Sequence, residues 1–184
     1  MTFRNTTRSW GVISKSLHWL IVLLIIMQWV IMQRAEALPM GSDKIFAIGM
    51  HKSFGMTVFA LAIIRLVWRW ANPVPTLDGL AKNWERMLAG LSHLLLYGLI
   101  LAMPLTGWLM SSARNFPVSW FGIFTLPDLV APDKALYERM NDLHHALFAA
   151  LVIVALLHIA GALKHQFIDR NEVLRRMLPF GGVK

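Results

Sequence analysis

The chain has 184 residues, of which 57% are hydrophobic and only 15% are charged, and its formal net charge is +8. Soluble domains of this length carry more charge, so the composition indicates an integral membrane protein without a separate water-soluble module. The absence of cysteine excludes disulfides, thiolate nucleophiles, iron–sulfur clusters and covalent attachment of a c-type haem. We therefore expect one membrane domain over residues 1–184.

Four apolar stretches are long enough to cross a bilayer as helices. The first lies between Lys15 and Arg34, and the second stops at the sequence NPVP that begins with Asn72, because proline lacks a backbone donor. The third contains Pro104, and residues 111–141 after it are expected to form a partly buried interfacial loop. The chain is thus predicted to be an all-α, integral membrane four-helix bundle with approximate spans 16–33, 47–70, 87–110 and 143–165.

The distribution of basic residues predicts the orientation of this bundle. Four spans place both termini on one side, and twelve of the 18 Lys and Arg residues lie on that side. Because Lys and Arg are enriched in cytoplasmic loops, both termini are predicted to be cytoplasmic. That side carries the whole net charge, which is therefore a topology signal, and no nucleic-acid partner is expected. The twelve residues are Arg4, Arg8, Lys15, Arg65, Arg69, Lys82, Arg86, Lys164, Arg170, Arg175, Arg176 and Lys184.

Three histidines of the fourth span, His144, His158 and His165, fall on one stripe. At about 100° per residue, the steps between them are nearly whole numbers of helical turns, whereas His145 points elsewhere. A lone histidine on an apolar helix is usually a hydrogen-bonded packing residue. Two histidines near opposite faces of a membrane require a common explanation, because polar side chains inside hydrocarbon are costly and usually functional.

The predicted topology gives the histidines two depths. His18 and His158 lie toward the cytoplasmic side, and His51 and His144 lie toward the outer side. Two neutral imidazoles on opposing helices are the ligands of a six-coordinate b-type haem, whose large apolar ring suits the interior of a helix bundle. Zinc would require about four ligands per site, which neither depth offers. Two b haems are predicted, with these two pairs as iron ligands; copper held by histidine and methionine is the remaining metal alternative.

Arg65 follows His51 by nearly four helical turns, so it lies on the same face at the depth of the inner pair. A guanidinium there either holds haem propionates or is a snorkelling cytoplasmic arginine. Gly55 and Gly161 lie near the predicted ligands, and they allow either a flat ring or a second helix to approach the backbone.

Two further histidines lie in the cytoplasmic half of the predicted bundle. His93 on the third span is an alternative inner ligand to His18 or His158; otherwise it hydrogen-bonds a propionate or lines a pocket. His165 is two turns beyond His158 and next to Lys164. It is either a group that exchanges protons with a quinone or a solvated histidine at a helix end.

Several sequence segments together resemble the bacterial cytochrome b561 family, which includes the b-type subunits of some hydrogenases. They are SLHW, MHKSFG, GLSHLLLYGL, the loop PVSWFGIFTLP, LHHAL with LLHIAGALKHQF, and DRNEVLRRM. The resemblance implies a multi-pass cytochrome of the bacterial inner membrane with two b haems. By matching motif, His18 and His158 would bind the cytoplasmic haem, and His51 and His144 the periplasmic haem.

Some family members are superoxide oxidases, which pass an electron from superoxide at the periplasmic haem to ubiquinone near the cytoplasmic haem. The position that matches His165 contributes to their quinone site. The resemblance therefore implies an electron-transfer protein between the quinone pool and a periplasmic donor or acceptor, with superoxide oxidase as the leading enzymatic interpretation. Two alternatives remain: an anchor subunit of a larger oxidoreductase complex, and a haem-free transporter or scaffold that uses its histidines as a proton path.

Overall fold

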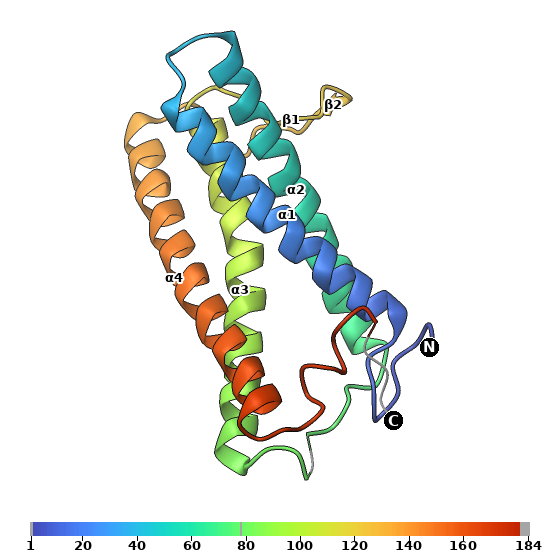
Figure 1. Cartoon of the computed structure of the whole chain (residues 1–184). Helices are drawn as coiled ribbons and strands as arrows, with labels where there is room; N and C mark the ends of the chain where they lie inside the picture. The colour runs from blue at the N-terminus through green and yellow to red at the C-terminus, as the bar shows by residue number, and fades with distance from the viewer. Residues whose placement is uncertain (1, 78, 181–184) are drawn as a thin grey trace.

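Four long helices make up most of the described chain (Figure 1). The computed structural model describes residues 2–77 and 79–180. The helices are α1 (Val12–Ala37), α2 (Ser42–Trp70), α3 (Asn83–Ala113) and α4 (Lys134–Phe167). Each is long enough and apolar enough to cross a membrane. The predicted four-helix membrane bundle is confirmed.

The helices extend beyond the apolar spans on which the prediction rested. The expectation of a loop over residues 111–141 is wrong at both ends, because α3 continues to Ala113 and α4 begins at Lys134. Asp133 caps α4, since its carboxylate accepts a hydrogen bond from the backbone N–H of Leu136 at 3.0 Å. The first two turns of α4 are rich in charged residues, so the absence of charge marks the membrane span and not the helix.

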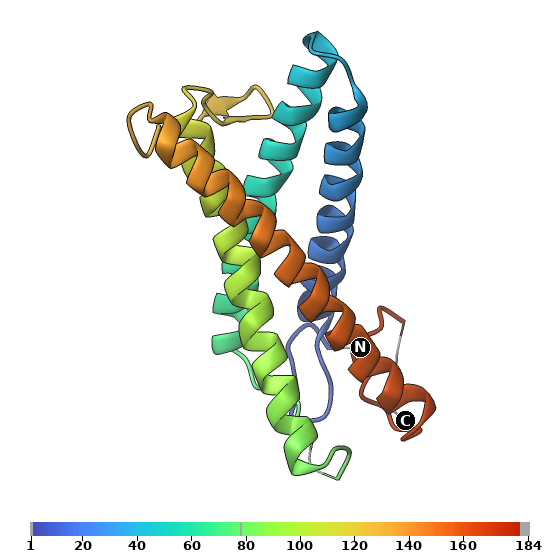
Figure 2. The same cartoon turned by 90° about the vertical axis from the view of Figure 1, so that its left-hand side faces the viewer.

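The four helices form two packed pairs, α1 with α2 and α3 with α4, joined by contacts between α2 and α3 (Figures 1 and 2). Within the described residues, the backbone of α4 does not approach that of α1 or α2 closely. A small buried cluster of Ile21, Leu24 and Val58 joins α1 to α2. Many large apolar side chains elsewhere are exposed, as expected of helices whose outer faces meet lipid. The pairing leaves an interior between the two helix pairs.

The connection between α3 and α4 is fastened to the side of α2. It contains a short antiparallel hairpin, β1 (Ser119–Trp120) and β2 (Phe124–Thr125). The Ser53 hydroxyl accepts a hydrogen bond from the Phe121 N–H at 3.0 Å, and the Trp120 indole N–H donates to Thr57 Oγ1 at 3.1 Å. The predicted partial burial of this loop is confirmed by Val118, which is only 3% exposed.

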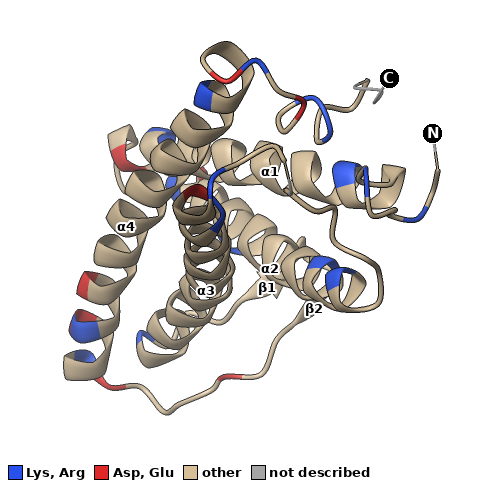
Figure 3. Ribbon diagram, turned by 90° about the horizontal axis from the view of Figure 1, so that it is seen from below, with Lys and Arg blue, Asp and Glu red and all other residues tan. Residues whose placement is uncertain are grey.

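Both termini lie at the opposite end of the bundle (Figure 1). The segment after α4 crosses this end and reaches α1, where the Trp19 indole N–H donates to the Met177 carbonyl at 2.9 Å. Figure 3 shows the bundle from this end, with Lys and Arg residues (blue) on the segments near both termini. Lys184, the last residue in the count of basic residues, lies outside the described residues. That this end faces the cytoplasm stays a prediction from the charge distribution.

Candidate cofactor sites

An apolar cavity opens between the two helix pairs in the half of the bundle away from the termini. His51 of α2 and His144 of α4 both line it, with their ring centroids 6.4 Å apart and their planes at 76°. The structure thus brings together the two histidines predicted to form the outer pair. All four helices contribute apolar wall residues, including Ile25, Trp29, Val58, Ile100, Met103 and Phe148.

The hydrogen bonds of this pair define the tautomer of each ring. Nδ1 of His144 lies 3.1 Å from Thr106 Oγ1, and the Thr106 hydroxyl donates its own proton to the Met103 carbonyl at 2.8 Å. The hydroxyl oxygen therefore accepts from His144, whose Nδ1 carries the proton. Nδ1 of His51 lies 3.4 Å from the Gln28 carbonyl, which also can only accept. Both rings keep the Nε2 lone pair available, which is the arrangement of histidines that bind a metal.

The spacing of the outer pair fits an iron between the two rings. Metal–imidazole bonds are about 2 Å long, so two imidazoles bound across one metal have ring centroids about 6 Å apart. The observed separation is 6.4 Å. Gly107 of α3 faces His144, because a Cβ at this position would lie 3.3 Å from His144 Cε1. The two Nε2 atoms and the apolar walls of the cavity therefore suit a b-type haem.

His145 does not share this position. It is exposed at the edge of the cavity, and its ring lies 6.4 Å from that of His144 at an angle of 88°. This agrees with the helical phase that predicted a different direction for His145.

Three histidines gather at the inner level. The rings of His93 and His158 are 5.2 Å apart at 61°, and His18 is an electrostatic neighbour of both. His93 and His158 come from α3 and α4, which pack directly against each other and leave less room for a flat ring. His18 and His158 come from α1 and α4, whose backbones stay apart in the described residues. The helix arrangement therefore favours His18 with His158 as ligands, and His93 as a neighbour of His158.

Arg65 extends from α2 toward this inner group. Its Nη1 donates to the Ser14 carbonyl of α1 at 2.7 Å, and its guanidinium also hydrogen-bonds the side chain of Tyr97 on α3. It is an electrostatic neighbour of His18 and His158. Arg65 therefore lies at the depth expected from its spacing to His51, and the remaining N–H groups of its guanidinium are donors suited to propionates.

His165 is buried at the inner end of α4, with only 8% of the residue exposed, so the interpretation as a solvated histidine is wrong. Its Nδ1 lies 2.8 Å from Asp169 Oδ2. Lys164 Nζ lies 2.7 Å from the same carboxylate and 2.5 Å from Glu85 Oε1 of α3. The Lys164 ammonium holds the pKa of Asp169 below its usual range, so this carboxyl stays ionised.

Glu85 and Asp169 were missed in the sequence. Asp169 follows His165 by one helical turn, which was the available signal, but it lies beyond the apolar span. Glu85 is distant in sequence, and only the packing of α3 against α4 brings it here. One atom each of Glu85, His165 and Asp169 lie within 4.8 Å of one another, a spacing that could hold a metal ion. Lys164 already places a positive charge between the two carboxylates, so a metal is not required to neutralise them.

Residues 9–180 match the family model described as Prokaryotic cytochrome b561. The chain belongs to the prokaryotic cytochrome b561 family. Cytochrome b561 homolog 2 of Escherichia coli (strain K12) is 33% identical over 179 residues, which cover 97% of this chain and 95% of the relative. Cytochrome b561 homolog 1 of the same organism is 25% identical over 164 residues, covering 89% and 93%. A protein from Yersinia pestis named Probable superoxide oxidase CybB is 24% identical over 163 residues, covering 89% and 92%.

Membership confirms the resemblance drawn from the sequence motifs. This cytochrome b561 is a multi-pass bacterial membrane protein of an electron-transfer family, and the family implies haem b as its cofactor.

Proposed function

We propose that this cytochrome b561 forms one domain in the inner membrane and binds two b haems, which His51 and His144 hold at the outer level and His18 and His158 at the inner level. The observation that carries the proposal is the outer pair, with two Nε2 atoms free to bind and ring centroids 6.4 Å apart across an apolar cavity. Haem b supplies one-electron redox chemistry when bound. The chain would supply the imidazoles that hold each iron, the distance between the two levels and the exclusion of water.

Electrons enter or leave at the outer level through a periplasmic donor or acceptor, and we propose superoxide as the donor. Lys52 follows His51 and lines the same cavity, with its ammonium 2.8 Å from the Phe116 carbonyl. Arg114 is its electrostatic neighbour. Lys52 places a positive charge on the cavity wall, where Glu36 is the acidic residue, and this charge is what would attract an anion such as superoxide. The relative named Probable superoxide oxidase CybB supports this choice.

At the inner level we propose ubiquinone as the electron acceptor, in contact with His165. The complete reaction takes one electron from each of two superoxide anions, which leave as two O₂ molecules. One ubiquinone receives both electrons and two protons, and becomes ubiquinol. His165 is buried, polar and in the last turn of a helix long enough to span a membrane, which suits a group that exchanges a proton with a quinone oxygen.

The test uses the purified chain alone, reconstituted in lipid nanodiscs with short-chain ubiquinone. Superoxide is generated enzymatically, and ubiquinol formation is followed together with the visible spectrum. We expect reduced b-type absorption bands, two haems per chain and ubiquinol formation that superoxide dismutase suppresses. Reduced b-type bands without any turnover would contradict the superoxide reaction and favour the anchor subunit. A spectrum without b-type bands would contradict the cytochrome assignment and favour the haem-free transporter.

The anchor subunit of a larger oxidoreductase complex is supported by one surface feature. The tip of the β1–β2 hairpin exposes apolar side chains, with Ile123 in the turn 71% exposed and Phe124 at the start of β2 54% exposed. An apolar tip of this kind suits a partner protein as well as the membrane interface. A pull-down that recovers a redox subunit only when the tip is intact would favour this second function.

A further inference from the structure

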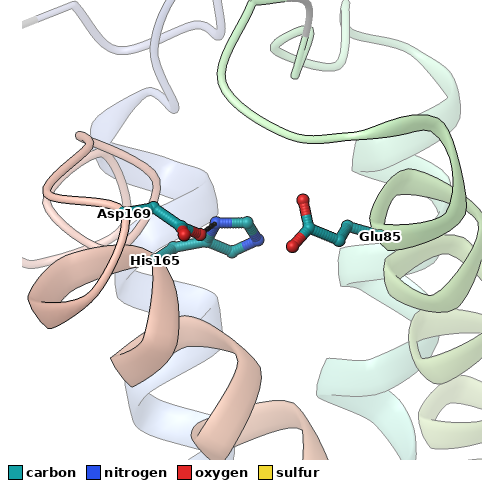
Figure 4. Close-up of side chains that lie close together, drawn as sticks. All are labelled: Glu85, His165 and Asp169. Carbon is teal, nitrogen blue, oxygen red and sulfur yellow. Dashed lines mark ion pairs between the residues drawn. The ribbon is translucent and has the colours of Figure 1, made fainter.

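His165 is held between two carboxyl groups that come from different parts of the chain. Glu85 is in the first turn of α3, His165 in the last turn of α4, and Asp169 just beyond α4. In Figure 4 the imidazole lies between the two carboxyl groups, with one edge toward Asp169 and the other toward Glu85. The proposed role of His165 in quinone chemistry does not by itself require such a setting.

The contact with Asp169 assigns the proton on the ring. An ionised carboxylate only accepts hydrogen bonds, so the 2.8 Å contact means that Nδ1 of His165 is the donor. The amide nitrogen of Asn171 donates one N–H to the Leu80 carbonyl at 2.8 Å and lies 3.2 Å from the same Nδ1, a longer contact than the 2.8 Å to the ionised Asp169, which therefore decides the tautomer. Nε2, on the edge that faces Glu85, is therefore the nitrogen that exchanges a proton. Carboxylates orient catalytic and metal-binding histidines in the same way.

Lys164 fixes both carboxyl groups. Its ammonium lies 2.7 Å from Asp169 Oδ2 and 2.5 Å from Glu85 Oε1, and the other Glu85 oxygen accepts from the Lys82 backbone N–H at 2.8 Å. This network ties the beginning of α3 to the end of α4. Lys164, Asp169 and Glu85 are the charged groups that the described structure places against or beside His165.

We propose that Asp169, held by the Lys164–Glu85 ion pair, is a positioning residue that makes Nε2 of His165 the proton donor to the quinone. The proposal rests on the proposed function. When a quinone takes up two electrons and two protons, an O–H bond forms at each of its oxygens. At one oxygen the new proton comes from Nε2 of the imidazolium, whose N–H bond breaks. The ring is then neutral and still donates through Nδ1 to Asp169, and water replaces the Nε2 proton afterwards.

The decisive variant is Asp169→Asn, which keeps the size of the side chain and removes its charge. We expect kcat for ubiquinone reduction to fall about tenfold, because an oriented proton donor contributes at least this much. The KM for ubiquinone should change less than twofold, the haem count should stay at the wild-type value, and the solvent deuterium isotope effect on kcat should increase. Glu172→Gln is the matched control, because it removes a carboxylate three residues beyond Asp169 on the same tail, and its turnover should be unchanged.

The double variant His165→Ala/Asp169→Asn tests whether Asp169 acts through His165. We expect it to turn over at the rate of His165→Ala alone. Additive slowing would overturn the proposal, as would wild-type kcat in Asp169→Asn. If Asp169→Asn loses haem, Asp169→Glu is the second variant, because it keeps the charge but shifts the carboxylate. We expect Asp169→Glu to retain haem and to turn over more slowly. Wild-type turnover in this variant would overturn the proposal. Unchanged turnover in His165→Ala would contradict the proposed quinone role itself, which is a distinguishable result.

Discussion

The two ends of the bundle offer histidines very different surroundings. At the outer level, His51 and His144 face an apolar cavity, and their Nδ1 atoms bond only to a neutral carbonyl and a neutral hydroxyl. At the inner end, His165 is surrounded by the charges of Lys164, Asp169 and Glu85. Neutral hydrogen-bond partners suit a ligand that stays in one protonation state, whereas charged partners suit a ring that gains and loses a proton. The comparison separates electron transfer at the outer level from coupled electron and proton transfer at the inner end.

The largest expected effect comes from removing an outer imidazole. His144→Ala should leave one haem per chain in a pyridine haemochrome assay and abolish superoxide-dependent turnover, because the outer iron loses an axial ligand. His145→Ala is the matched control on the adjacent residue and should retain two haems. If His145→Ala lost a haem and His144→Ala kept both, the assignment of the outer ligand would be wrong.

The inner level gives a second, equally large contrast. His158→Ala should lose the inner haem, whereas His93→Ala should keep both haems, because His93 lies on α3, which packs directly against the helix that carries His158. The midpoint potential of the inner haem in His93→Ala is expected to shift, since a polar neighbour of the ligand has been removed. One haem per chain in His93→Ala would make His93 the ligand instead of His18.

These contrasts also separate the site residues that the sequence could predict from those that it could not. Spacing on one helix and predicted depth were sufficient to pair His51 with His144, because an apolar helix keeps its phase over several turns. The inner group needed packing information, since His93 and His18 lie at similar depths on different helices and only the packing of α3 on α4 distinguishes them. Glu85 and Asp169 lie outside the apolar spans, so the cost of a polar group in hydrocarbon gives no signal for them.

A smaller effect is expected from Lys52, the lysine that lines the outer cavity. Lys52→Gln should lower kcat/KM for superoxide about three- to tenfold at low ionic strength, because the local positive potential that attracts the anion is reduced. The difference from wild type should disappear as salt is added, since salt screens this attraction. Lys44→Gln removes a charge from the same helix without changing the cavity lining and should show little effect. A defect in Lys52→Gln that persists at high salt would contradict steering.

The smallest expected effect concerns the space beside His144, and it tests whether the outer cavity is shaped for a ligand. In the interior of a helix, Gly→Ala is favourable by about 0.5–1 kcal/mol where the new methyl group has room. Gly98 has no atom within 4 Å of a Cβ added to it, so Gly98→Ala should raise the melting temperature of the haem-loaded protein slightly. At Gly107 on the same helix the added Cβ would lie 3.3 Å from His144 Cε1.

The methyl group at Gly107 therefore has to displace the ring that we assign to the outer haem. Gly107→Ala should not raise the melting temperature, and it should shift the midpoint potential of the outer haem. Gly98→Ala should leave both haem potentials unchanged. Thermal unfolding followed by the haem absorbance would measure the melting temperature, and a redox titration would measure the midpoint potentials. Equal stabilisation by both substitutions, with unchanged potentials, would show that His144 is not confined by α3 and would remove the structural contrast between the outer cavity and the rest of the bundle.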